Sequence, residues 1–131
     1  MNEQNAWRGS SSDTPAEPFD VGRGTVLGRV FWIRRDPNLQ VGLWSVNQDD
    51  VRTAPAPYVF TGDETILVLE GEVEVDVEPN TNVHLRAGEI ASFKKGTTSQ
   101  WNILSDEYKE LFVYAFLAAG DSTGYARSKV P

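Results

Sequence analysis

The sequence of 131 residues contains no cysteine and only one histidine, His84. Without cysteine, the chain can form neither disulfide bonds nor thiolate metal sites. With one imidazole, it also lacks the pair of histidines that many metal sites and proton relays take from a single chain. The stability of the fold must therefore come from its core, and any chemistry must come from other side chains.

Long apolar stretches are scarce as well. The longest run, residues 111–119, is too short for a membrane-spanning helix and suits a buried strand. Residues 1–12 contain no apolar segment of the kind found in a signal peptide, so we expect a cytoplasmic protein.

Basic residues are outnumbered by acidic ones. There are 12 Lys and Arg residues against 19 Asp and Glu residues, which gives a formal net charge of −7. Such a charge repels the phosphates of nucleic acids and of anionic membrane surfaces. We therefore expect neither nucleic acid nor a membrane as a partner.

The chain does contain enough sequence for one domain. Residues 1–20 are rich in Ser, Asn, Asp, Glu and Pro, and this composition buries too little apolar surface to offset its ordering entropy. We predict a flexible N-terminal arm there and a C-terminal tail over residues 120–131. The folded domain is then expected to span residues 21–119.

Short segments separated by turn residues fill the predicted domain. In residues 72–77, valines alternate with carboxylates, as in a strand with one buried and one solvated face. A helical period is not sustained anywhere in the sequence. We therefore predict an all-β fold, built as an antiparallel barrel or sandwich. The predicted strands are residues 24–33, 39–46, 58–60, 65–70, 72–77, 83–85, 90–94, 99–104 and 110–118.

Two segments resemble the conserved motifs of the cupin superfamily. Glu64 precedes Gly71 by seven positions, as in the first motif, and Gly88 and Gly96 match the glycines of the second motif. Lys94 stands where the second motif has a proline. More narrowly, the chain is similar to small single-barrel cupins related to ureidoglycine aminohydrolase and to an ethanolamine-utilisation protein. This resemblance implies a single antiparallel β-barrel of the cupin, or jelly-roll, type.

The resemblance also gives the positions at which metal-binding cupins carry histidines. On the first motif these positions are occupied by Tyr58 and Phe60 at the shorter spacing, or by Pro57 and Val59 at the longer one. On the second motif the position is occupied by Ser99. Since a first-row metal needs several converging donors, we predict that the chain binds no metal and no other cofactor.

Glu64, the glutamate of the first motif, has two interpretations. It is either a carboxyl that points into the barrel, where an apolar wall would raise its pKa and suit it to acid–base catalysis, or a solvated carboxylate at the rim. Tyr58 and Phe60 share strand parity with Glu64, and Ser99 shares parity with Trp101.

These five side chains are therefore expected to line one pocket for a small organic ligand, with Glu64 as the catalytic group. The alternative is that Phe60 and Trp101 simply fill the barrel. Lys94 is a further candidate, because at the barrel mouth it would attract a carboxylate ligand.

Three functions follow. The first is a metal-free cupin that binds a small polar metabolite, either as a binding module or as a lyase or isomerase with Glu64 as base. The second is a structural or interaction protein with a filled barrel. The third, implied only by the resemblance, is a metal-dependent aminohydrolase or dioxygenase. A homodimer is also expected, because small cupin barrels pair through their sheets and residues 26–33 and 111–117 are apolar enough to take part.

Overall fold

The computed structural model describes residues 5–9, 17–20, 26–47 and 56–116. These residues form ten strands, and none of them belongs to a helix that could span a membrane. The strands are β1 (Glu17–Asp20), β2 (Val26–Arg35), β3 (Leu39–Asn47), β4 (Ala56–Val59), β5 (Asp63–Glu70), β6 (Glu72–Val77), β7 (Thr81–Arg86), β8 (Ile90–Phe93), β9 (Thr98–Ile103) and β10 (Glu107–Ala115).

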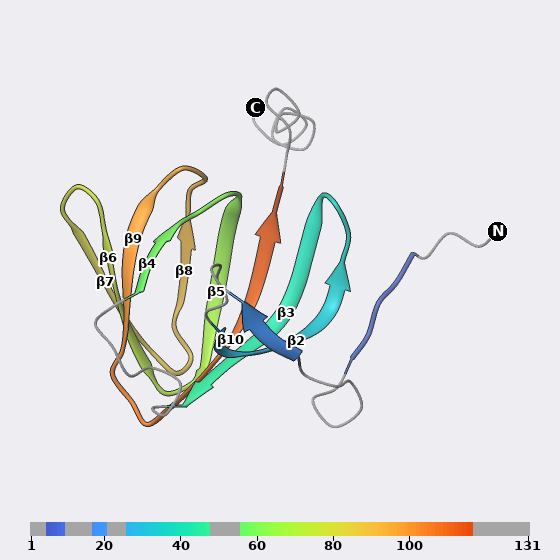
Figure 1. Ribbon diagram of the computed structural model, residues 1–131, viewed down its shortest axis with the longest axis horizontal. Helices are drawn as coiled ribbons and strands as arrows, with labels where there is room; N and C mark the ends of the chain where they lie inside the picture. The colour runs from blue at the N-terminus through green and yellow to red at the C-terminus, as the bar shows by residue number, and fades with distance from the viewer. Residues whose placement is uncertain (1–4, 10–16, 21–25, 48–55, 117–131) are drawn as a thin grey trace.

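The strands form two antiparallel sheets that face each other (Figure 1). The six-stranded sheet has the order β1-β2-β3-β10-β5-β8, and the four-stranded sheet has the order β4-β9-β6-β7. Strands β5 and β10 are neighbours although they are far apart in the sequence, so the six-stranded sheet is held together by long-range pairing. The expected all-β antiparallel barrel of the cupin type is confirmed.

Alternation along each strand decides which side chains enter the core. In β10 the buried positions are every second residue from Tyr108 to Tyr114, and in β6 they are Val73 and Val75. Because successive side chains of a strand point to opposite faces, the buried residues of both sheets meet between the sheets. Val73 and Val75 are 0% exposed and pack in one cluster with Ile66 and Val68 of the opposite sheet.

All nine predicted strands are present, with ends that differ by a few residues. The predicted strand 83–85, for example, extends over Thr81–Arg86, because the turn before it is shorter than the polar residues suggested. The predicted strand 110–118 begins three residues earlier, at Glu107. Its predicted end, like the C-terminal tail, lies outside the described residues.

The last four residues of the predicted N-terminal arm form a strand. Glu17–Asp20 forms strand β1 and pairs with β2, so the six-stranded sheet includes residues assigned to the arm. The Glu17 carboxylate accepts a hydrogen bond from Trp32 Nε1 at 2.8 Å and pairs with Arg35 at 3.0 Å. These contacts stabilise the ordered strand. They could not be predicted from the composition of residues 1–20.

The turn between β5 and β6 depends on Gly71. Its φ of +87° lies in the left-handed region, and a Cβ there would lie 2.2 Å from the Glu107 carbonyl oxygen. The same Cβ would lie 2.4 Å from Ser105 Oγ, which accepts a hydrogen bond from the backbone N–H of Glu72. Gly88, with a φ of +92°, offers a control because a Cβ there would meet nothing within 4 Å.

We expect Gly71→Ala to destabilise the protein more than Gly88→Ala does. Both variants carry left-handed strain of roughly 1–2 kcal/mol, and Gly71→Ala adds about 1–3 kcal/mol because its methyl group overlaps backbone. Urea unfolding followed by tryptophan fluorescence measures both losses. Equal losses would show that the Gly71 turn is not packed as described.

Candidate functional site

Glu64 points into the barrel. It is the second residue of β5, on the face of the strand shared with Ile66 and Val68, and it is 7% exposed. Register places it between Tyr114 of β10 and Phe93 of β8, which are both buried. The solvated-rim interpretation is therefore wrong for this glutamate.

A second carboxyl group is buried in the same interior. Glu110 of β10 is 2% exposed and accepts a hydrogen bond at 2.6 Å from the hydroxyl of Tyr108, which is itself 1% exposed. Sequence analysis missed Glu110. Strand parity could have identified it, because Glu110 shares its face of β10 only with the aromatic residues Tyr108, Phe112 and Tyr114.

Burial changes the ionisation of both carboxyls. Loss of solvation raises the pKa of Glu64 well above the usual range, and the nearby charge of Glu110 raises it further. Loss of solvation raises the pKa of Glu110 to about 8, and the hydrogen bond from Tyr108 offsets part of this effect. Near neutral pH, the interior therefore favours protonated, uncharged carboxyl groups.

Two phenols beside these carboxyls are held in fixed positions. The Tyr58 hydroxyl donates a hydrogen bond at 2.8 Å to the Tyr114 hydroxyl, which also accepts from the Thr61 backbone N–H at 2.8 Å. Burial, and next the charge of Glu64, raise the pKa of Tyr58 above its usual range. Tyr58 thus remains a protonated hydrogen-bond donor at every ordinary pH.

The predicted aromatic residues form one cluster on the inner side of the barrel. Phe60 stacks on Phe93 with ring centroids 4.8 Å apart, and Tyr58 meets Phe60 edge to face at 4.9 Å. Trp101 lies 6.3 Å from Phe60 and 6.5 Å from Tyr58, between ring centroids. These rings fill much of the space that sequence analysis assigned to a ligand.

Ser99 stabilises this arrangement. It is 1% exposed, and its hydroxyl donates to the Tyr58 carbonyl at 2.8 Å and accepts from Trp101 Nε1 at 3.1 Å. Ser99 therefore fixes the positions of two aromatic residues. The structure thus brings four predicted residues, Tyr58, Phe60, Ser99 and Trp101, together with Glu64 on the inner side.

Lys94 and His84 lie apart from this interior group. Lys94 is exposed in the turn that follows β8, and its carbonyl accepts a hydrogen bond from the Thr97 backbone N–H. His84 of β7 is exposed, and its Nε2 contacts the carboxylate of Glu72. The single imidazole of the chain thus contacts a carboxylate on the surface.

The Glu64 carboxyl retains contact with solvent. Every fully buried side-chain nitrogen or oxygen of the described residues has a hydrogen-bond partner. Within that same part of the chain, no group hydrogen-bonds to the Glu64 carboxyl. Its oxygens therefore lie at the edge of the buried region and keep a small contact with solvent.

The donor set does not fit a metal of the cupin type. Tyr58, Phe60 and Ser99 occupy the positions that the motifs give to histidines. Over residues 5–9, 17–20, 26–47 and 56–116, no three His, Cys, Asp or Glu side chains converge on one point. Glu64 and Glu110 supply two carboxyls, fewer than a first-row metal ordinarily needs.

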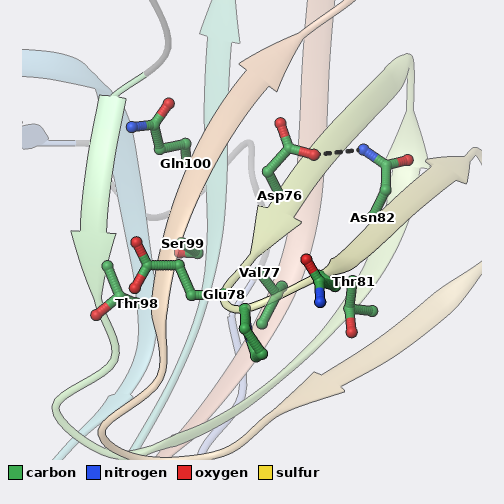
Figure 2. Close-up of a pocket in the computed structure, with 10 residues that line it drawn as sticks. Asp76, Val77, Glu78, Thr81, Asn82, Thr98, Ser99 and Gln100 are labelled. Atoms are coloured by element: carbon green, nitrogen blue, oxygen red, sulfur yellow. Dashed lines mark hydrogen bonds between the residues drawn. The ribbon is translucent and has the colours of Figure 1, made fainter.

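A pocket of about 410 Å³ lies elsewhere, where the β6–β7 hairpin meets the start of β9 (Figure 2). Figure 2 shows Asp76 and Asn82 facing each other across the hairpin, joined by a hydrogen bond of 2.6 Å. Ser99 is the one predicted site residue that borders it. Most residues that line the pocket have polar side chains, and most of them are exposed, including Glu78 and Gln100.

The family model of the EutQ-like cupin domain matches residues 39–110, which is more than half of the chain. The match contains Glu64, Glu110 and the whole aromatic cluster. No curated protein matches the sequence.

Solved structures show the same fold at low sequence identity. EutQ from Clostridium difficile is 20% identical with a TM-score of 0.57, over 82% of this chain and 79% of that one. The cupin domain of Cnp3 from Schizosaccharomyces pombe is 10% identical with a TM-score of 0.63, over 93% and 80%. The Fe(II) form of HppE is 14% identical with a TM-score of 0.62, over 86% of this chain but only 62% of that one. Together with the family match, the fold and the position of Glu64 on the first motif show that this chain belongs to the family of EutQ-like cupin domains.

Proposed function

We propose that this cupin domain binds a small polar metabolite beside Glu64, without a metal, and that Glu64 exchanges a proton with it. One observation carries the proposal. The Glu64 carboxyl is 7% exposed, reaches solvent, and accepts or donates no hydrogen bond within the described part of the chain. A buried polar group without a partner is costly, and a ligand that supplied one would offset that cost.

The surroundings of Glu64 suit proton transfer. A general acid or base works best when its pKa lies near the working pH, and burial raises the pKa of Glu64 in that direction. The isomerase form of the proposal needs a base that removes a proton next to a carbonyl and then returns it. The lyase form needs a base for that proton and an acid for the leaving group. One carboxyl beside fixed phenols can serve either reaction.

A structural relative supports small-molecule chemistry in such a barrel. HppE has been solved in its Fe(II) form with an alternative substrate. The analogy concerns the place of binding and not the chemistry, because the residues around Glu64 do not include the donors that hold a metal of that type.

Binding is best followed at the indole N–H of Trp101, which is hydrogen-bonded to Ser99. We expect a member of a panel of small amino acids, hydroxy acids and amides to shift this signal in a ¹H–¹⁵N spectrum. The indole signal of Trp7, which lies in the N-terminal segment under Arg34, serves as a control in the same spectrum. A panel that moves no signal near Trp101 would count against the proposal.

For the compound so identified, we expect Glu64→Gln to lower turnover by about a hundredfold or more while its dissociation constant changes only a few-fold. The amide keeps the shape of the carboxyl but exchanges no proton. Glu70→Gln, at an exposed position of the same strand, is the matched control and should remain active. Dialysis against a chelator should leave turnover unchanged. Full activity of Glu64→Gln would remove Glu64 from the mechanism.

A specific observation favours a second function, association through the outer face of the six-stranded sheet. Apolar side chains cross five neighbouring strands in register on that face, and Ile90 at its edge is 65% exposed. A second copy of this chain is the proposed partner, since an apolar row can pair with the same row of another copy around a two-fold axis. The members of the row are Leu43, Leu111, Leu67 and Ile90, and it ends on β2 at Phe31, which is 6% exposed.

We expect the wild-type protein to be a dimer by light scattering and a charge on this face to dissociate it. Ile90→Glu and Val113→Glu place carboxylates at positions that are 65% and 36% exposed, so that both variants should fold. Val59→Glu, on the four-stranded sheet at a position that is 51% exposed, should remain dimeric. Dimers that persist in both face variants would exclude this surface.

A further inference from the structure

The interior of the barrel holds two acidic groups without a cationic partner. Ion pairs within the described residues join Arg34 to Asp36, Arg35 to Glu17, and Arg86 to Glu72, which His84 also contacts. None of them includes Glu64 or Glu110, and neither carboxyl has any further partner in that part of the chain. Buried carboxyls in proteins are usually paired with a cation or hydrogen-bonded on both oxygens. An external cation would supply the positive charge that these carboxyls lack within the described residues.

The two carboxyls differ in what they can contact. Glu110 is the deeper one, at 2% exposure, and one of its oxygens is occupied by the Tyr108 hydroxyl at 2.6 Å. Glu64 is nearer to solvent and has both oxygens available. A cation that entered the barrel would therefore contact Glu64 directly and feel the charge of Glu110 behind it.

Aromatic residues are the cross-strand neighbours of Glu64. Phe93 and Tyr114 are its direct neighbours on β8 and β10, with side chains on the same inner face. Phe60 stacks on Phe93, and Tyr58 lies next to Phe60. The electron-rich faces of such rings attract alkylated ammonium groups, which cost less to desolvate than a bare metal ion.

We infer that the ligand bound beside Glu64 is an organic ammonium compound, whose charged nitrogen pairs with the Glu64 carboxyl and whose carbon atoms contact the neighbouring aromatic rings. The inference rests on the proposed function and names its substrate class. A carboxylate or phosphate ligand gains no ion pair from a protonated carboxyl and is repelled by an ionised one, and a divalent metal finds too few donors. The net charge of −7 also favours the approach of a cation.

Binding of an ammonium ligand is coupled to the release of a proton from a carboxyl. A protonated carboxyl must release its proton to solvent before it can pair with the ammonium, so affinity rises with pH until that carboxyl is already ionised. The hydroxyls of Tyr58 and Tyr108 stay protonated over this range, because burial raises their pKa values above the usual range.

The inner residues of β8 and β9, Phe93, Ser99 and Trp101, do not titrate. The ionisable groups that face Glu64 are Tyr58 of β4 and Tyr108, Glu110 and Tyr114 of β10.

The test compares isopropylammonium with 2-propanol, which has nearly the same shape and no charge. Both are titrated into the full-length protein between pH 6 and pH 8, with the Trp101 indole N–H as the signal. An alkylammonium stays charged over this range, because its pKa is close to that of lysine, about 10.4. We expect the ammonium to bind at least about tenfold more tightly than the alcohol at pH 8, and its affinity to increase by up to about tenfold per pH unit.

Matched variants separate the contributions of the two carboxyls. Glu64→Gln and Glu110→Gln should each weaken the binding of isopropylammonium by about tenfold or more and flatten the pH dependence of its affinity. Glu70→Gln should bind it as the wild type does. If the alcohol binds as tightly as the ammonium and depends on Glu64, the ammonium inference is overturned while the proposed function stands. If the ammonium does not bind at all, the inference also fails, and the metabolite panel decides separately on the proposed function.

Discussion

The structure depends on one constraint, the burial of two carboxyl groups in an otherwise apolar barrel. Glu64 and Glu110 lie inside among aromatic and branched side chains, and no cation of the described chain accompanies them. Removing an ionised carboxyl from water costs far more than one hydrogen bond returns. The protein meets this cost by keeping the carboxyls protonated and by giving Glu110 a hydrogen bond from Tyr108. Glu64, the carboxyl without a hydrogen-bond partner among the described residues, is therefore where we propose that a ligand binds.

Much of the fold could be predicted from local patterns. Valines that alternate with carboxylates in β6 reveal one buried and one solvated face without any tertiary information. The glutamate and glycine spacing around Gly71 placed Glu64 on the first cupin motif, and shared parity correctly brought Tyr58 and Phe60 to the inner side with it. These inferences succeed because a strand repeats every two residues, so that sequence position alone assigns a face.

What sequence analysis missed depends on partners that are distant in the chain. In the sequence, Glu110 is a charged residue at the start of an apolar run. Its burial follows from the central position of β10, between β3 and β5 in the six-stranded sheet. Glu17 looks like part of a polar arm, but it is ordered by Trp32 and Arg35 of β2. For both glutamates, the residues that bury or order the side chain come from other strands.

The most direct test of this account is the free energy of unfolding measured from pH 5 to pH 8. Carboxyls whose pKa is raised on folding bind protons more tightly in the folded state, so their stabilising effect is complete below the pKa of the unfolded chain, about 4.3. It is lost as the pH rises through the folded value, which is about 8 for Glu110. The account predicts that stability falls over this range, by at most about 1.4 kcal/mol per pH unit for each group, and that the double variant Glu64→Gln, Glu110→Gln removes this fall. Identical pH dependence in the wild type and the double variant would contradict it.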